Sequence, residues 1–108
     1  MSTYTALADP HRRTILELLR TGERPVNDLV DRLGLSQPGV SKHLKVLRDA
    51  GLVASRTHGQ QRLYALRAEP LIEIADWLEP YRMLWAARLD DLQRHLDSHP
   101  QTPAQEGS

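Results

Sequence analysis

Cysteine is absent from this chain of 108 residues. Its absence excludes disulfide bonds, thiolate metal sites and cysteine nucleophiles together. No N-terminal secretory signal is evident, and no apolar run is long enough to cross a bilayer, so we expect a cytoplasmic protein without a membrane partner. Aromatic residues make up only 5% of the chain, and most of them lie within residues 77–85.

An excess of charge of either sign is also missing, because the formal net charge at pH 7 is zero. By itself this would argue against a nucleic-acid partner, but the charges are unevenly distributed. Residues 1–69 hold 11 Lys and Arg against 7 Asp and Glu, whereas residues 70–108 hold 3 against 7. Residues 36–67 hold six basic residues and one acidic residue. A local basic patch matters more for DNA binding than the overall sum.

Catalytic motifs are lacking as well. Ser36, Ser41 and His43 do not form a nucleophile set, because a helix cap and a polar helix face account for them and no third orienting group is apparent. No glycine-rich phosphate loop occurs. The sequence therefore predicts that the protein is not an enzyme and requires no cofactor.

Residues 36–50 form the most informative stretch, and we expect them to be helical. Ser36 is a good N-cap, Pro38 fits the first turn, and Gly51 is suited to a left-handed C-terminal cap. Gly39 fits poorly, since alanine in a helix is better by up to about 1 kcal/mol. Glycine here either allows a close backbone approach or is neutral, and the sequence leaves both alternatives open.

The predicted helix has two different faces. Val40, Leu44 and Leu47 recur at i, i+4 and i+7 and form an apolar stripe. The other side carries a hydroxyl group and three basic residues, namely Ser41, Lys42, Lys45 and Arg48. A helix that packs on a small domain and presses cationic side chains against phosphates would have this pattern. A solvated surface helix is the alternative.

Two further helices are expected before this one. Asp9-Pro10 is a typical helix start, and the helix runs to about Arg20. A second helix covers about residues 26–33, with Arg24-Pro25 at its start and Gly34 at its end. A tight turn then leads into Ser36, which predicts a helix-turn-helix. Residues 1–8 indicate a short N-terminal helix or arm.

A β-hairpin is expected after Gly51. Residues 52–57 alternate as a half-buried strand does, His58-Gly59 is a turn, and residues 61–66 form the return strand. Arg56, His58 and Arg62 lie near the predicted tip, where they would reach the DNA backbone or minor groove. The alternative is that Arg56 and Arg62 are ordinary edge-strand charges.

The final element runs from Pro70 to Asp97. Apolar residues follow one another at spacings of three and four, which is more apolar surface than a helix flanking a small wing needs. We interpret it as a dimerisation helix that Pro80 kinks or splits; the alternative is that it folds back on its own domain. The expected dimer interface comprises Tyr4, Leu78, Tyr81, Trp85, Leu89 and Leu92.

These expectations together define a fold that is mainly α with a small β-hairpin. It is a winged helix-turn-helix with N- and C-terminal dimerisation helices. Residues 1–97 would be the DNA-binding domain, including the dimer helix at about 70–97. Residues 98–108 are polar, contain two prolines and are expected to be a disordered tail.

Three runs of sequence resemble the ArsR/SmtB-type winged-helix transcription regulators: ALADPHRRTIL from Ala6, LSQPGVSKHLKVL from Leu35, and AGLV from Ala50. The resemblance extends from about Tyr4 to Leu96. It implies a homodimeric repressor that binds double-stranded DNA at a palindromic operator. It also implies that DNA is contacted by Ser36, Gln37, Ser41, Lys42 and His43 and by the wing.

The role of His43 stays open at the level of sequence. His43 would be a base reader, a phosphate donor or a partly buried structural histidine. Lys45 would contact phosphates and so affect all DNA sequences alike, whereas Gln37 would read bases. A winged helix used only for protein–protein contact is the competing class of function.

The sequence departs from the metal-sensing members of this family. Residues 26–29 have no cysteine where many members carry a thiolate sensor on the helix before the recognition helix. Asp91, His95 and His99 stand at i, i+4 and i+8 and offer ligands that suit zinc. However, the family's spacing is not reproduced and Pro100 follows directly, so we favour a solvated helix end over a zinc-responsive site. No metal is expected, and an inducer, whether small molecule or protein, is unidentified.

Overall fold

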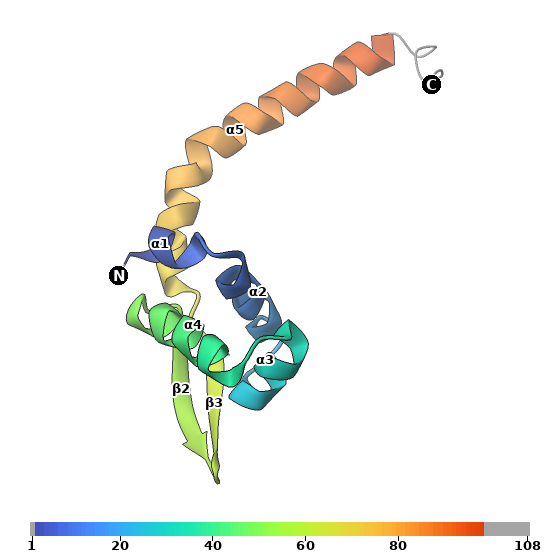
Figure 1. Ribbon diagram of the computed structural model, residues 1–108. Helices are drawn as coiled ribbons and strands as arrows, with labels where there is room; N and C mark the ends of the chain where they lie inside the picture. The colour runs from blue at the N-terminus through green and yellow to red at the C-terminus, as the bar shows by residue number, and fades with distance from the viewer. Residues whose placement is uncertain (1, 99–108) are drawn as a thin grey trace. The chain divides into compact units, whose positions relative to one another are not determined.

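A computed structural model describes residues 2–98 (Figure 1). The chain divides into two compact units, the first ending at Ile74 and the second beginning at Ala75. The first unit contains four helices, a small sheet and the first turn of a fifth helix. The second contains the remainder of that fifth helix. The units are described separately below.

The four helices of the first unit are α1 (Thr3–Leu7), α2 (Pro10–Leu19), α3 (Val26–Leu33) and α4 (Gln37–Asp49). Local capping explains where they begin and end. The Asp9 carboxylate accepts a hydrogen bond from the His11 N–H at 2.7 Å at the start of α2. Gly34 has φ of 69° and ends α3 in the left-handed conformation that glycine adopts at little cost. The predicted helix-turn-helix is therefore formed by α3 and α4.

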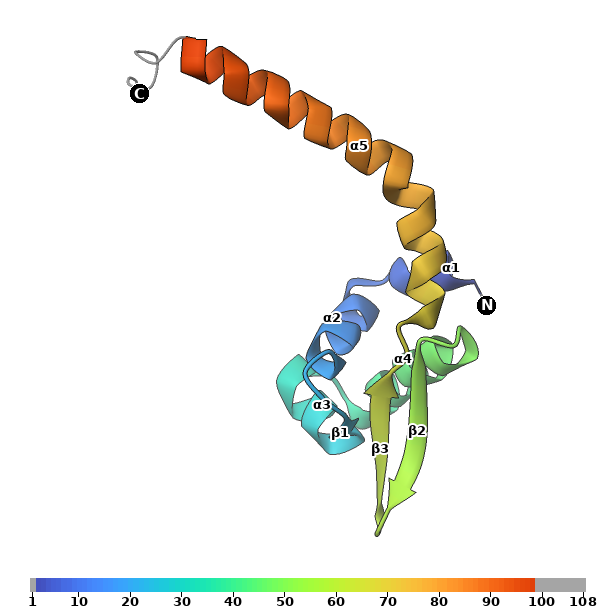
Figure 2. The ribbon, with the colours of Figure 1, turned by 180° about the vertical axis from the view of Figure 1, so that it is seen from behind.

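The core of this unit lies where α2, α3 and α4 meet (Figures 1 and 2). Each helix contributes its apolar stripe: Ile15 from α2, Leu29 from α3, and Leu44 from α4 are almost fully buried. Leu52 and Val53, just after α4, close the core beside the sheet. Burying each such side chain contributes about 1.5–3 kcal/mol, so this cluster holds α4 in place against the domain.

The sheet has three antiparallel strands rather than the two expected from the sequence. They are β1 (Arg24–Pro25), β2 (Val53–His58) and β3 (Gln61–Leu66), in the order β1-β3-β2. Arg24-Pro25 was expected to start a helix, but these residues pair with Tyr64 and Leu63 of β3. The hairpin turn also differs by one residue, because His58 still pairs with Gln61 and the turn is made by Gly59 and Gln60.

Helix α5 (Glu69–Ser98) continues through Pro80, so the helix is not split there. The sequence had placed Ser98 in the C-terminal tail, but Ser98 is the last residue of α5. The disordered tail predicted for the remaining residues, 99–108, lies outside the described residues. Within residues 2–98, none of the helices combines the length and the apolar character needed to span a bilayer.

Candidate nucleic-acid interface

The first turn of α4 is built around the Ser36 hydroxyl. Its oxygen accepts a hydrogen bond from the Gly39 N–H at 3.2 Å, which confirms Ser36 as the N-cap. A β-carbon at position 39 would lie 3.2 Å from the same oxygen. The close approach at position 39 is therefore to the helix cap of its own chain.

The two faces of α4 are arranged as predicted. Val40, Leu44 and Leu47 are at most 1% exposed and face the core. The outer face carries five exposed polar or basic side chains, namely Gln37, Ser41, Lys42, Lys45 and Arg48. Buried residues on one side of a rigid helix thus hold a polar and cationic face towards solvent.

The cations on this face are accessible to a polyanion. Lys45 approaches the Asp49 carboxylate at 3.3 Å, but both side chains are largely exposed. Such surface pairs contribute at most about 1 kcal/mol and are readily exchanged for another anion. Among residues 2–98, no carboxylate lies within ion-pair distance of Lys42 or Arg48. The outer face of α4 is therefore suited to contact phosphates.

His43 lies at the edge of α4 and is half-buried. Its ring centroid is 5.7 Å from that of His11, and its Nδ1 is 3.5 Å from Nη1 of Arg12. Burial lowers the pKa of His43 below its ordinary value of 6.5; Asp9 opposes this shift, while the cationic neighbours Arg12, His11 and Lys42 reinforce it. A neutral, partly buried ring wedged between helices favours the structural role for His43.

The neighbouring Arg12 connects α4 with the N-terminal helix. Its Nε donates to the Ala6 carbonyl at 2.7 Å and its Nη2 to the Thr5 carbonyl at 3.1 Å. Arg13 donates to the Leu7 carbonyl at 2.7 Å. These guanidinium groups bind the last carbonyls of α1, and the Thr5 carbonyl also accepts the N–H of the C-cap residue Ala8 at 3.2 Å. The sequence did not reveal this arrangement, because the two ends are brought together only by the loop at residues 8–9.

Strand register places Arg62 on the sheet face that also carries the core residues. Successive side chains point to opposite faces, so Val53, Ser55 and their partners on β3 share one face. Val53 is 3% exposed and belongs to the core. The Arg62 Nη1 donates to Ser55 Oγ at 3.1 Å. Arg62 is therefore on the same side of the wing as the helix-turn-helix.

Arg56 and His58 lie on the other face of the wing. The Arg56 guanidinium binds the carboxylate of Glu23, just before β1, at 2.5 and 3.1 Å. The hydrogen bond from Arg56 lowers the pKa of Glu23 below its ordinary 4.5, and the same bond raises the pKa of Arg56. The structure thus separates the three basic wing residues that the sequence grouped together, and it gives Arg56 an anionic partner of its own.

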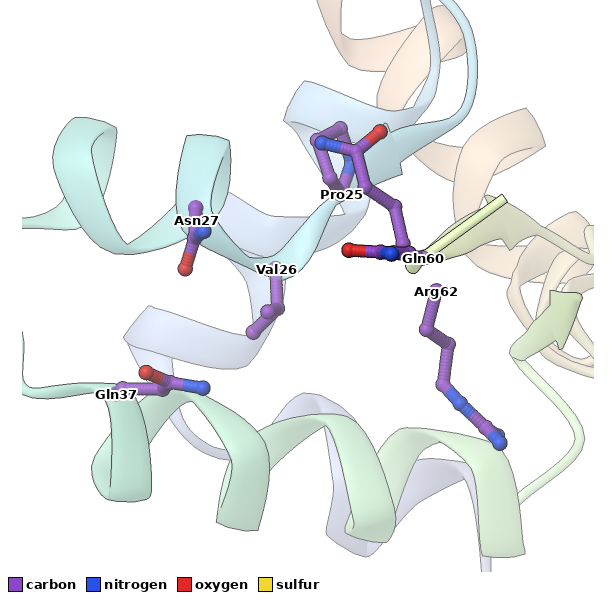
Figure 3. Close-up of a pocket in the computed structure, with 7 residues that line it drawn as sticks. Pro25, Val26, Asn27, Gln37, Gln60 and Arg62 are labelled. Carbon is purple, nitrogen blue, oxygen red and sulfur yellow. The ribbon is translucent and has the colours of Figure 1, made fainter. Parts of the chain in front are cut away.

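A hollow of about 220 Å³ lies between the start of α3, the start of α4 and the wing (Figure 3). Besides Gln37 and Arg62 it is lined by three amide-bearing residues that sequence reasoning missed: Asn27, Gln60 and Gln61. Figure 3 shows Val26 directed from α3 towards the space above α4. Isolated amides in a loop and at a helix start carry no sequence signal, so only the fold could assemble them.

The possible zinc ligands are not assembled in the described residues. The Asp91 carboxylate binds the Arg94 guanidinium. Within residues 2–98 there is no group of three histidine, aspartate or glutamate side chains that could hold a metal ion. His99, the third residue of the predicted set, lies outside the described residues.

Comparison with known proteins identifies the family. Residues 9–55 match the family described as "Bacterial regulatory protein, arsR family". The HTH-type transcriptional regulator Rv2034 of Mycobacterium tuberculosis is 38% identical over 105 residues, covering 91% of this chain and 95% of that protein. The transcriptional repressor SdpR of Bacillus subtilis is 31% identical over 77 residues, covering 71% and 86%.

Solved structures agree with the fold. An ArsR-like transcriptional regulator from Rhodococcus sp. RHA1 has a TM-score of 0.64 and 31% identity, covering 84% of this chain and 86% of that one. The match extends over the winged helix-turn-helix, whose exposed basic helix is described above. The chain therefore belongs to the arsR family of bacterial regulatory proteins, and it is a DNA-binding transcriptional regulator rather than an enzyme.

Proposed function

We propose that this protein is a cytoplasmic homodimer that represses transcription by binding a palindromic operator. The outer face of α4 enters the major groove, and each subunit reads one half-site. The observation that carries the proposal is the exposed, cationic face of α4, held by a fully buried stripe on its other side. Two such helices related by a twofold axis would lie about 34 Å apart, one turn of DNA.

Each DNA contact is proposed from the position of its side chain. Gln37 and Ser41, at the exposed start of α4, would meet base edges, whereas Lys42 and Lys45 would contact phosphates. Arg62 would contact DNA from the α4 side of the wing. Three other predicted contacts acquire different roles in this proposal. Ser36 caps α4, His43 packs against α2, and Arg56 is bound to Glu23.

His58 is exposed at the end of β2, on the same face as Arg56. Its contact with DNA stays a prediction. At the wing tip a side chain from either face can approach a minor groove, so the register alone does not remove it from the proposed surface.

Dimerisation is proposed from an exposed apolar stripe on α5. At 100° per residue, six residues fall within an arc of about 80°. They are Leu78, Tyr81, Trp85, Leu89, Leu92 and Leu96. Trp85 is 53% exposed and Leu89 is 65% exposed in the single chain. A contiguous apolar stripe of this length is typical of a surface that another protein covers. Tyr4, 46% exposed on α1, stays a predicted interface residue.

Salt titration of duplex binding tests DNA recognition. Lys45→Ala should weaken binding to operator and random duplexes alike and reduce the slope of log K against log salt by about 1. Gln37→Ala should instead alter the preference among operator variants. Arg88→Gln, an exposed change of the same charge on α5, is the matched control and should leave the slope unchanged. Failure of the wild type to bind duplex beyond a weak nonspecific level would support a protein adaptor instead.

Sedimentation velocity tests the dimer. Trp85→Ala should weaken association by about 2 kcal/mol or more, which corresponds to about thirtyfold in Kd. Met83→Ala is the matched control because Met83 is 66% exposed and lies on α5 outside the stripe. If both variants dimerise like the wild type, the interface has been placed on the wrong face of α5.

A further inference from the structure

The hollow between α3, α4 and the wing has an unusual lining. Its polar lining residues are Asn27, Gln37, Gln60, Gln61 and Arg62. By strand register the Gln61 side chain lies on the face opposite to Arg62, because Gln61 pairs with His58. No carboxylate lines it, although the chain as a whole has as many acidic as basic residues. The surface is therefore rich in N–H donors and carries one positive charge.

The four amides are not used in holding the fold. Among the hydrogen bonds within residues 2–98, the side chains of Asn27, Gln37, Gln60 and Gln61 make none, whereas Arg62 uses one N–H on Ser55. Each primary amide retains two N–H donors, and the Arg62 guanidinium keeps further N–H groups besides the one bound. In Figure 3, Asn27 from α3 points towards Gln37 at the start of α4, and the Gln60 amide is directed into the space beside them, whereas the Arg62 side chain extends towards α4.

We propose that this hollow holds a backbone phosphodiester of the bound duplex, with the side-chain amides of Asn27 and Gln60 donating to its oxygens and Arg62 neutralising its charge. The inference rests on the proposed function, because it assumes that α4 lies in the major groove. A phosphate accepts hydrogen bonds from several directions and carries negative charge, which matches the donors and the missing carboxylates.

The position of the hollow favours a DNA strand over a small phosphate compound. Gln37 lines the hollow and also stands at the exposed start of α4, where base reading is proposed. Gln60 and Gln61 belong to the turn and return strand of the wing. A strand that leaves the major groove beside α4 and passes under the wing would cross this space. Its phosphate would then fix the register of Gln37 on the bases without reading sequence itself.

Isosteric carboxylates provide the test. Asn27→Asp and Gln60→Glu change no shape but place a negative charge against the phosphate, and each should weaken binding to operator and random duplexes about tenfold or more. Gln93→Glu is the control for the change in net charge, since Gln93 lies on α5. It should weaken binding much less. Circular dichroism verifies that all three variants are folded.

Phosphate-ethylation interference adds a direct readout. In the wild-type complex, ethylation of several phosphates per half-site should block binding, and in Asn27→Ala one of these positions, that of the phosphate held in the hollow, should lose its effect. If Asn27→Asp and Gln60→Glu bind duplex as Gln93→Glu does, the hollow does not hold a phosphate. If inorganic phosphate at constant ionic strength binds the wild type but not Asn27→Asp, and does so without displacing the duplex, the hollow is a site for free phosphate and the inference fails. The proposed function fails separately, if the wild type itself shows no salt-dependent duplex binding.

Discussion

Replacing Ser36 and Gly39 singly and together tests how the recognition helix begins. Ser36→Ala removes the oxygen that accepts the Gly39 N–H at 3.2 Å, and loss of such a cap costs about 1 kcal/mol of unfolding free energy. Gly39→Ala should gain up to about 1 kcal/mol of helix propensity. In the wild type, however, the new methyl group would stand 3.2 Å from the Ser36 oxygen, closer than ordinary contact. We therefore expect crowding of the cap to cancel the gain.

The double variant removes that conflict. With Ser36→Ala already present, Gly39→Ala should stabilise by close to its full propensity, so the two changes are coupled by about 1 kcal/mol. For a chain of this length the coupling corresponds to about 4 °C in Tm. Urea unfolding followed by circular dichroism measures it, at one protein concentration because association would shift the midpoint.

The outcome for Gly39→Ala alone decides between the two explanations of this glycine. If Gly39→Ala stabilises the wild type as much as it stabilises Ser36→Ala, the hydroxyl does not restrict position 39 and glycine there is neutral for folding. Operator affinity provides a second readout. Because Gln37 lies in the same turn, Ser36→Ala should weaken specific binding more than binding to random duplex.

Three other predictions follow from the described contacts. Leu44→Ala, at a position 1% exposed in the core, should cost about 2–5 kcal/mol in urea unfolding; a loss below about 1 kcal/mol would contradict its placement. Arg62→Gln should lower the slope of log K against log salt for duplex binding by about 1. Arg56→Gln should leave this slope unchanged, because Arg56 is bound to Glu23 on the other face of the wing. The reverse result would show that the wing faces were assigned wrongly. Because burial depresses the pKa of His43 in the folded state below 6.5, the unfolded state binds the proton more readily. The contribution of His43 to the unfolding free energy should therefore be complete above pH 6.5 and be lost as the pH drops below it. Urea midpoints should fall less between pH 7.5 and 5.5 in His43→Gln than in the wild type, and equal slopes would exclude His43 as the cause.

Much of the fold was predictable because the signals are local. Asp9 and Ser36 cap their own helices within three residues, and Gly34 ends α3 with its own φ angle. The apolar stripe of α4 is also a matter of spacing along one helix. Interactions within a single turn depend only on neighbouring residues, so the helix-turn-helix and its cationic outer face could be derived from the residues in order.

The wing shows where such reasoning ends. Arg24-Pro25 carries no strand pattern, and it becomes β1 only because β3 is available to pair with it. Arg56 and Arg62 look alike in the sequence, yet the register sends one to Glu23 and the other to the helix-turn-helix side. Which charges remain for DNA is therefore decided by the strand register of the wing and by Glu23, which is 33 positions from Arg56 in the sequence.

The sequence by itself determined the helices, the hairpin, their order and the polarity of each face of α4, because helical and strand periodicities act over a few residues. The tertiary structure alone decided which side chains share a site. Asn27, Gln37 and Gln60 line one hollow because the core packs α3 against α4 and the sheet sets the wing beside them. The free energy that brings these distant residues together comes from burial of the core. The sequence around Asn27, Gln37 or Gln60 alone therefore does not indicate the hollow.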